Sequence, residues 1–144
     1  MEYEYLSSEG SLLPKSFFHG CMYMILFTKH KCEPCKRLVN ILNSLDLTKY
    51  TNVALVVVSM DSCLSEWDLC KKPTNWLYMP FYPEVYKKKL FSKFKVNSLP
   101  FITFADNDTW INVPRNIVVG KRKELIEYIE YCISCFNIEH YELL

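Results

Sequence analysis

The hydrophobic positions of this chain form two short continuous runs, and a segment of helical periodicity separates them. Residues 22 to 27 and residues 53 to 58 are apolar throughout, which is typical of strands buried on both faces of a sheet. Between them, apolar side chains recur at helical spacing at positions 38, 39, 41, 42 and 45. The order strand, helix, strand predicts a right-handed crossover between parallel strands, and therefore an α/β fold.

The second half of the chain adds elements that would cover and extend this sheet. The pattern predicts a loop over residues 61 to 83, a helix over 84 to 94, an antiparallel hairpin built from 101 to 104 and 110 to 113, and a closing amphipathic helix over 121 to 136. The turn-forming cluster Asp106-Asn-Asp would join the arms of the hairpin. Three consecutive lysines, Lys87, Lys88 and Lys89, are expected on the solvent-exposed face of their helix.

Composition agrees with a chain that folds around its own hydrophobic core. Of the 144 residues 50% are hydrophobic, and the seven cysteines are about half the density that marks a disulfide-stapled secreted scaffold. With three glycines and no repeat or Gly/Ser linker, we expect a single domain over residues 1–144, with a core of about 17–136. The net charge of +1 supplies no field for a nucleic-acid backbone or an anionic membrane, so neither partner is expected.

The N-terminal segment indicates the cellular setting. It carries Glu2, Glu4 and Glu9 and lacks the basic start and small-residue cleavage site of a secretory signal. The longest apolar run, residues 21 to 27, is far shorter than the roughly twenty residues that a transmembrane helix needs. We therefore expect a soluble, monomeric protein of the cytoplasm, with nuclear entry as an alternative. In a reducing compartment, cysteines at CxxC spacing indicate redox or metal chemistry rather than a structural disulfide.

The motif with the clearest chemistry is Cys32-Glu-Pro-Cys35, which directly precedes the first predicted helix. Pro34 suits the first turn of a helix, where a missing N–H costs no hydrogen bond. This places Cys32 at a helix N-terminus, where free N–H groups and the helix dipole favour an anion and lower the pKa of a thiol. We therefore expect Cys32 to be the catalytic nucleophile and Cys35, less exposed on the same face, to resolve the mixed disulfide.

Charged residues surround this motif. The cluster consists of Lys29, Lys31, Lys36, Arg37 and Glu33, with a local charge of +3 in a chain whose total is +1. The cations favour the Cys32 thiolate and Glu33 opposes it, with salt screening much of the effect. For the basic residues alone, a solvated helix start is the better interpretation. Residues 22 to 27 contain no carboxylate that could accept a proton beneath the cysteines, so proton transfer would use water.

Three further motifs accompany the CxxC. They are Val58-Ser-Met-Asp61, Trp76-Leu-Tyr-Met-Pro-Phe81 and Phe94-Lys-Val-Asn-Ser-Leu-Pro100. Together with the CxxC at the mouth of a helix, they resemble the thioredoxin superfamily, and within it the tryparedoxin and nucleoredoxin branch. The similarity runs without a gap from Val58 to Pro100 and extends more weakly from about residue 17 to residue 131.

The resemblance implies a thioredoxin fold, in which helices flank a central mixed sheet and a cis-proline loop lies opposite the CxxC. Pro100 would be that cis-proline, and Leu99 would offer its backbone to an extended substrate segment. Trp76 and Phe81 would lie near the rim of the active site. From the residues alone, a trans proline at the start of a strand and aromatic side chains that fill the core beneath a loop are the alternatives.

The chain departs from the branch pattern beside the first cysteine. The branch has tryptophan where this chain has Lys31, and two prolines where this chain has Glu33 and Pro34. A flexible cation thus replaces a flat aromatic surface, which would alter the choice of partner. The residues expected to contact substrate are Lys31, Glu33, Pro34, Trp76, Leu99 and Pro100.

The other cysteines are expected to be passive. Cys132 and Cys135 form a second CxxC in the closing helix, where Cys132 belongs to the apolar stripe, so buried inert thiols are the better interpretation. A four-cysteine zinc site with the first pair is the weaker one, because the sequence separation far exceeds that of zinc ribbons. Cys63 and Cys70 fall in the irregular segment and could oxidise or pair, although isolated cysteines there are more often passive.

These features predict an enzyme that reduces or exchanges protein disulfides through Cys32 and Cys35 and supports cell redox homeostasis. Its expected partners are protein disulfides, including those of peroxiredoxins, and an upstream dithiol reductant or reductase. Neither an organic cofactor nor a metal is required, because the electrons reside on the sulfurs. The alternative is a redox-inactive binding module that uses the peptide groove near Pro100, and the presence of Lys31 in place of tryptophan motivates it.

Overall fold

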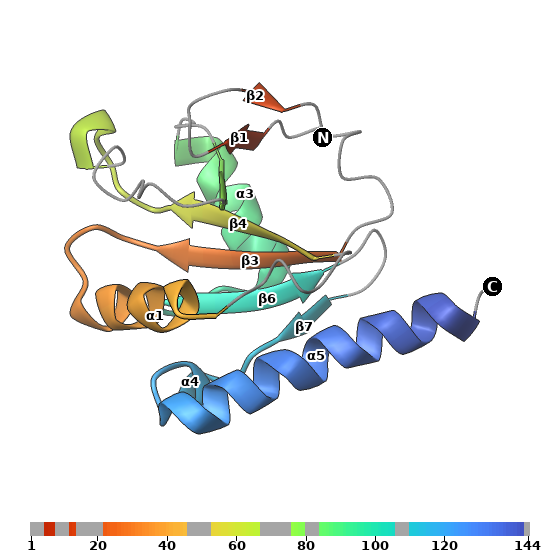
Figure 1. The fold of residues 1–144 in the computed structure, drawn as a ribbon. Helices are drawn as coiled ribbons and strands as arrows, with labels where there is room; N and C mark the ends of the chain where they lie inside the picture. Colours follow the sequence, from red (N-terminus) through yellow and green to blue (C-terminus); the bar gives the residue numbers. More distant parts are fainter. Residues whose placement is uncertain are drawn as a thin grey trace.

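The computed structural model describes residues 5–7, 12–13, 22–45, 53–66, 76–79, 84–105 and 110–142. These residues form a sheet with the strand order β2-β1-β5-β4-β3-β6-β7 (Figure 1). The strands are β1 (Tyr5–Ser7), β2 (Leu12–Leu13), β3 (Met22–Thr28), β4 (Val53–Ser59), β5 (Leu77–Tyr78), β6 (Phe101–Ala105) and β7 (Trp110–Asn112). The helices are α1 (Glu33–Asn43), α3 (Glu84–Phe94), α4 (Arg115–Val118) and α5 (Arg122–Glu142).

The pairing of the central strands confirms the predicted crossover. Strands β3 and β4 are parallel along their whole length, from Met22 opposite Val53 to Thr28 opposite Ser59. Strand β6 pairs antiparallel with β3, and β7 pairs antiparallel with β6, which is the predicted hairpin. The sheet is therefore mixed, and the ends of β3 and β4 lie side by side where the CxxC loop begins.

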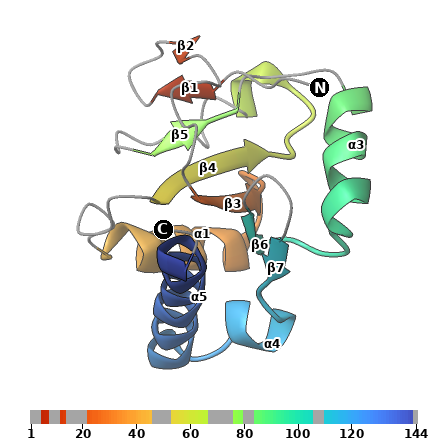
Figure 2. The same ribbon diagram turned by 90° about the vertical axis from the view of Figure 1, so that its right-hand side faces the viewer.

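Helices cover both faces of the sheet (Figures 1 and 2). Side chains alternate between the two faces along a strand, so Met24 and Leu26 pack with buried residues of α1 and α5, whereas Phe27 packs with α3. Phe27 is fully buried, and its ring centroid lies 5.8 to 6.2 Å from those of Phe91, Phe94 and Phe101. Helices α1 and α5 lie on the same face of the sheet, and the side chain of Arg122, at the start of α5, reaches Ser44 at the end of α1.

Several elements differ from the sequence prediction. The segment predicted as a loop over residues 61 to 83 contains β5, which pairs parallel with β4, and a helical turn over residues 64–66. Strands β1 and β2, helix α4 and the last turns of α5 were not predicted. Most of these elements are two to four residues long, which is too short for a periodicity to appear. Among the described helices, none combines the length and apolarity needed to cross a bilayer.

The prediction for the lysine run of α3 was wrong in part. Lys88 and Lys89 are exposed, but Lys87 is 4% exposed, and its Nζ donates a hydrogen bond to the backbone carbonyl of Asp61. A buried ammonium needs an oxygen partner, and that partner comes from a segment 26 residues away. A helical repeat could not reveal this contact, because it depends on how α3 packs on the sheet.

Candidate active site

The two cysteines of the first CxxC lie where β3 leads into α1. Cys32 is the N-cap of α1, with extended backbone angles (φ −151°, ψ 109°), and its Sγ accepts a hydrogen bond from the backbone N–H of Cys35 at 3.3 Å. Pro34 stands in the first helical turn, where its missing N–H leaves no bond unmade. Cys32 and Cys35 form a disulfide across a Cα–Cα distance of 5.2 Å. The predicted placement of Cys32 at a helix N-terminus is confirmed.

The two sulfurs differ in accessibility. Cys35 is 1% exposed, whereas Cys32 is half-buried and so reaches the surface. This difference follows from the helix: the fourth residue of the motif turns inward with the apolar face of α1, and the first remains outside the helix as its cap. A partner molecule can therefore approach Cys32 but not Cys35.

A buried carboxylate holds the loop that precedes Cys32. Asp61 is fully buried, and its Oδ1 and Oδ2 accept hydrogen bonds from the backbone N–H of His30 at 3.0 and 3.1 Å. Its Oδ2 also accepts a hydrogen bond from Ser59 Oγ at 2.6 Å. The parallel pairing of β3 and β4 makes this possible, because it places the residues that follow both strands next to each other. The sequence pattern places Asp61 in a motif but does not indicate its role as an anchor.

Two of the basic residues around Cys32 have carboxylate partners. Lys31 Nζ lies 3.6 Å from Glu66 Oε1, and Lys36 Nζ lies 3.3 Å from Glu33 Oε1. Lys31 is 77% exposed, so solvent screens its pair, and the same holds for the exposed Lys36 and Glu33. The positive field expected at Cys32 is therefore partly neutralised, and the helix terminus remains as the feature that favours a thiolate there.

The Leu99–Pro100 bond is cis, as the resemblance implied. Pro100 precedes β6, whose first residue, Phe101, pairs with Phe27 near the end of β3, so the proline lies at the edge of the sheet where the CxxC loop begins. Arg115 Nη1 donates hydrogen bonds to the carbonyl oxygens of Leu99 at 2.8 Å and of Pro100 at 3.1 Å. Sequence reasoning missed Arg115, because nothing in its local pattern links it to a loop fifteen residues away.

Of the two aromatic residues predicted at the rim of the active site, the structure describes Trp76. Trp76 is 6% exposed and belongs to the hydrophobic cluster formed with α1 and α5, which is the position of a core side chain. Contact of Trp76 with substrate stays a prediction. Phe81 lies outside the described residues.

The remaining cysteines are not part of the CxxC site. Cys132 is fully buried in α5, and burial, together with the charge of the neighbouring Cys135, raises the pKa of the Cys132 thiol to about 11. Cys63 is an exposed free thiol, and Cys70 lies outside the described residues. Within the part of the chain that the structure describes, no three His, Cys, Asp or Glu side chains are grouped closely enough to hold a metal ion.

A mixed sheet with helices on both faces, a disulfide at the start of α1 and a cis-proline at the same edge of the sheet define a thioredoxin fold with a dithiol site. The chain belongs to the thioredoxin-like family, because the model of that family matches residues 20–125. Proteins of this family are oxidoreductases, and the CxxC pair that such chemistry uses is present at disulfide distance.

Individual relatives support this assignment. The chain is 29% identical over 92 residues to nucleoredoxin of Xenopus laevis, an alignment that covers 64% of this chain and 22% of the nucleoredoxin. Tryparedoxin from Trypanosoma brucei superposes with a TM-score of 0.70 at 23% identity, covering 88% of this chain and 85% of that one. Thioredoxin from Wuchereria bancrofti superposes with a TM-score of 0.69 at 17% identity, covering 90% and 96%. The two solved structures establish the likeness of fold.

Proposed function

We propose that this protein reduces or exchanges protein disulfides through Cys32 and Cys35. The observation that carries the proposal is the asymmetry of the pair: an accessible sulfur caps α1, and a buried sulfur lies within disulfide distance of it. An attacking thiol must reach its substrate, and a resolving thiol must reach only the attacking one.

In the proposed reaction, the Cys32 thiolate attacks one sulfur of a substrate disulfide. A mixed disulfide forms, and the other substrate sulfur leaves as a thiolate. The Cys35 thiolate then attacks Cys32 Sγ and releases the second substrate sulfur, so two electrons pass to the substrate and the Cys32–Cys35 disulfide remains. The two substrate thiolates take up protons from solvent. An external dithiol returns the enzyme to its reduced form by the reverse exchange.

The position of Cys32 supports its role as nucleophile. An N-cap sulfur faces the unpaired N–H groups of the first helical turn, and the Cys35 N–H already points to it at 3.3 Å. These groups stabilise a thiolate more than a thiol. The alkylation rate of the reduced pair should therefore be appreciable at neutral pH, and a pH profile of that rate measures the effect.

The proposed setting is the cytoplasm, where the protein would act as a monomer in cell redox homeostasis. Peroxiredoxin disulfides are proposed substrates, and a dithiol reductant or its reductase is the proposed electron donor. The residues proposed to contact substrate around the two cysteines are Lys31, Glu33, Pro34, Trp76, Leu99 and Pro100. The chemistry resides on the sulfurs, so the proposal needs no metal or organic cofactor.

Reduction of insulin disulfides in the presence of dithiothreitol tests the proposal. Cys32→Ser should abolish the activity, because no other sulfur of the pair is accessible. Cys35→Ser should stall as a mixed disulfide with the substrate, which mass spectrometry detects. Cys63→Ser, which also removes an exposed thiol, is the matched control and should retain activity. Full activity of the Cys32→Ser variant would refute the assignment.

The alternative is a redox-inactive module that binds peptides near Pro100. It is motivated by Lys31, which replaces the flanking tryptophan of the branch and pairs with Glu66. The reduction potential of the Cys32–Cys35 couple separates the two functions. A value far outside the range of roughly −270 to −120 mV of thioredoxin-like exchangers would favour the binding module.

A further inference from the structure

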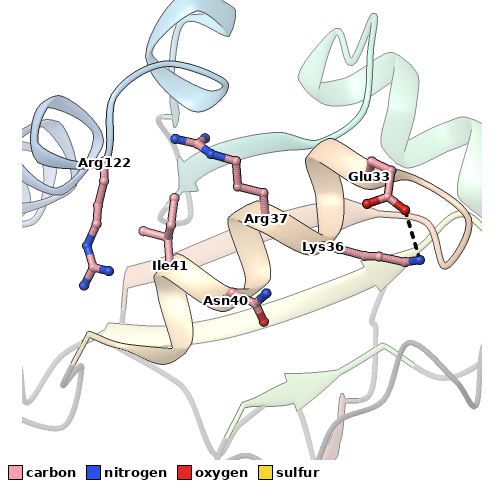
Figure 3. Close-up of a pocket in the computed structure, with 6 residues that line it drawn as sticks. All are labelled: Glu33, Lys36, Arg37, Asn40, Ile41 and Arg122. Carbon is pink, nitrogen blue, oxygen red and sulfur yellow. Dashed lines mark hydrogen bonds and ion pairs between the residues drawn. The ribbon is translucent and has the colours of Figure 1, made fainter.

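A groove runs along α1 beside the CxxC site (Figure 3). It has a volume of about 570 Å³, and its lining residues are Glu33, Lys36, Arg37, Asn40, Ile41 and Arg122. Five of these come from α1, and Arg122 comes from the first turn of α5. Glu33 directly follows Cys32 in the chain, so the Glu33 end of the groove is the end nearest to the CxxC motif along α1.

The lining of this groove is basic. Its three cations outnumber its one carboxylate, so it carries a net charge of +2, whereas the whole chain carries +1. Lys36 is paired with Glu33, and this leaves the two arginines to define the field. Arg37 Nη2 donates to the Gly120 carbonyl at 2.7 Å, and Arg122 Nη2 donates to Ser44 Oγ at 2.6 Å.

These hydrogen bonds position the guanidinium groups without neutralising them. Both acceptors are uncharged oxygens, and within the described part of the chain neither arginine forms an ion pair. Each guanidinium has five N–H donors, so most remain available for a carboxylate. Figure 3 shows Arg37 rising from α1 toward the turn before α5, and Arg122 reaching back alongside Ile41.

Helix stability does not explain the charge at this end of α5. Lys121, Arg122 and Lys123 stand together at its N-terminus, where the macrodipole disfavours positive charge, and Glu124 is the acidic residue of this first turn. Of these three, Arg122 lines the groove, so this one cation stands where helix energetics oppose it and where a bound anion would offset the cost.

We infer that the groove binds an acidic segment of the disulfide-containing substrate, an inference that rests on the proposed function. At a rise of 1.5 Å per residue along α1, Arg37 lies about 7.5 Å from Cys32, and Ile41, which lines the groove with Arg122, lies about 13.5 Å from it. An extended peptide advances about 3.3 Å per residue. Carboxylates about two and four residues from the attacked cysteine would therefore meet the two arginines.

Two peptides test this inference. Each has one cysteine with a thiopyridyl leaving group, and the second and fourth residues on both sides of it are Glu in one peptide and Gln in the other. The release of thiopyridone by the reduced protein, which each molecule carries out once, gives the second-order rate constant for each peptide. At low salt the Glu peptide should react about tenfold faster than the Gln peptide, and the ratio should fall as salt is added.

Variants assign the preference to the groove. Arg37→Gln combined with Arg122→Gln should bring the ratio of the Glu-peptide rate to the Gln-peptide rate close to one. Arg37→Lys combined with Arg122→Lys keeps both positive charges and should preserve most of the preference for the Glu peptide. The matched control is Lys88→Gln with Lys93→Gln, which removes two exposed charges from α3 on the other face of the sheet and should leave the ratio unchanged. If the control variant lost as much of the preference for the Glu peptide as the groove variant does, the preference would come from net charge, and the inference would be overturned.

A second measurement separates this inference from the proposed function. Cysteine-free versions of the two peptides, carrying a fluorophore, can be titrated with the oxidised protein and followed by anisotropy. Tighter binding of the Glu peptide that disappears in the Arg37→Gln, Arg122→Gln variant would support the groove even if the protein failed to reduce any disulfide. Equal binding of both peptides, or a preference that survives the double substitution, would overturn it.

Discussion

Replacing the buried carboxylate of Asp61 tests how the fold holds the loop that carries Cys32. Asp61→Ala removes the acceptor of the His30 N–H and of the Ser59 hydroxyl in a site without solvent access. The His30 N–H belongs to the loop that carries Cys32, so the substitution removes the side-chain link between this loop and the residues after β4. The substitution leaves the backbone carbonyl of Asp61, which accepts from Lys87, in place.

The cost can be worked from these contacts. A hydrogen bond to a charged group contributes about 1.5–3 kcal/mol, and a buried donor left without a partner costs about 1–3 kcal/mol. The favourable terms are partly offset by the desolvation of the carboxylate, so we expect a net loss of about 3 kcal/mol. That loss is a large fraction of the roughly 5–15 kcal/mol by which such a chain is stable.

Urea unfolding followed by circular dichroism measures this loss. With a slope of about 2 kcal/mol per molar urea, the midpoint should fall by about 1.5 M. Asp61→Asn keeps the volume and one acceptor oxygen and should lose less. Ser62→Ala, at the exposed neighbouring position, is the control and should stay within about 0.5 kcal/mol of the parent. A loss below about 1 kcal/mol for Asp61→Ala would refute the anchoring role.

Three further predictions follow from single residues. Burial raises the pKa of the Cys132 thiol from 9.0 to about 11, so the unfolded chain loses this proton at a lower pH than the folded protein. The free energy of unfolding should therefore fall as the pH rises from 9 to 11. In alkylation at pH 8, the exposed Cys63 should react and the buried Cys132 should not. Gly120→Ala would press a Cβ into a backbone carbonyl of α4 and should destabilise by about 1–3 kcal/mol in urea unfolding, and an unchanged midpoint would show that the turn adapts freely. Phe27→Ala should cost about 3–5 kcal/mol, because the side chain is fully buried among three aromatic rings, and a loss under 1 kcal/mol would contradict that packing.

Local pattern was enough to predict the central elements. The runs that became β3 and β4 are continuous and apolar because both faces of the sheet are covered, and such runs are visible without any partner. The N-terminus of α1 was predicted from Pro34 and from the periodicity that follows it, and with it the placement of Cys32 as a cap. These signals lie within a few residues of the feature they predict. The cis bond at Pro100 came from the resemblance, since local pattern alone favours trans.

Contacts between distant segments were decided by the tertiary structure alone. Asp61 holds the CxxC loop because parallel pairing of β3 and β4 brings it beside His30, and Lys87 is buried because α3 packs over that same end. Arg122 joins the groove along α1 only through the return of the chain into α5. Hydrogen bonds and charge pairs form between whatever residues the fold brings within about 3 Å, and sequence separation carries no information about that distance. The sequence by itself determined that the CxxC pair stands at the start of α1, and the packing of distant segments determined what surrounds it.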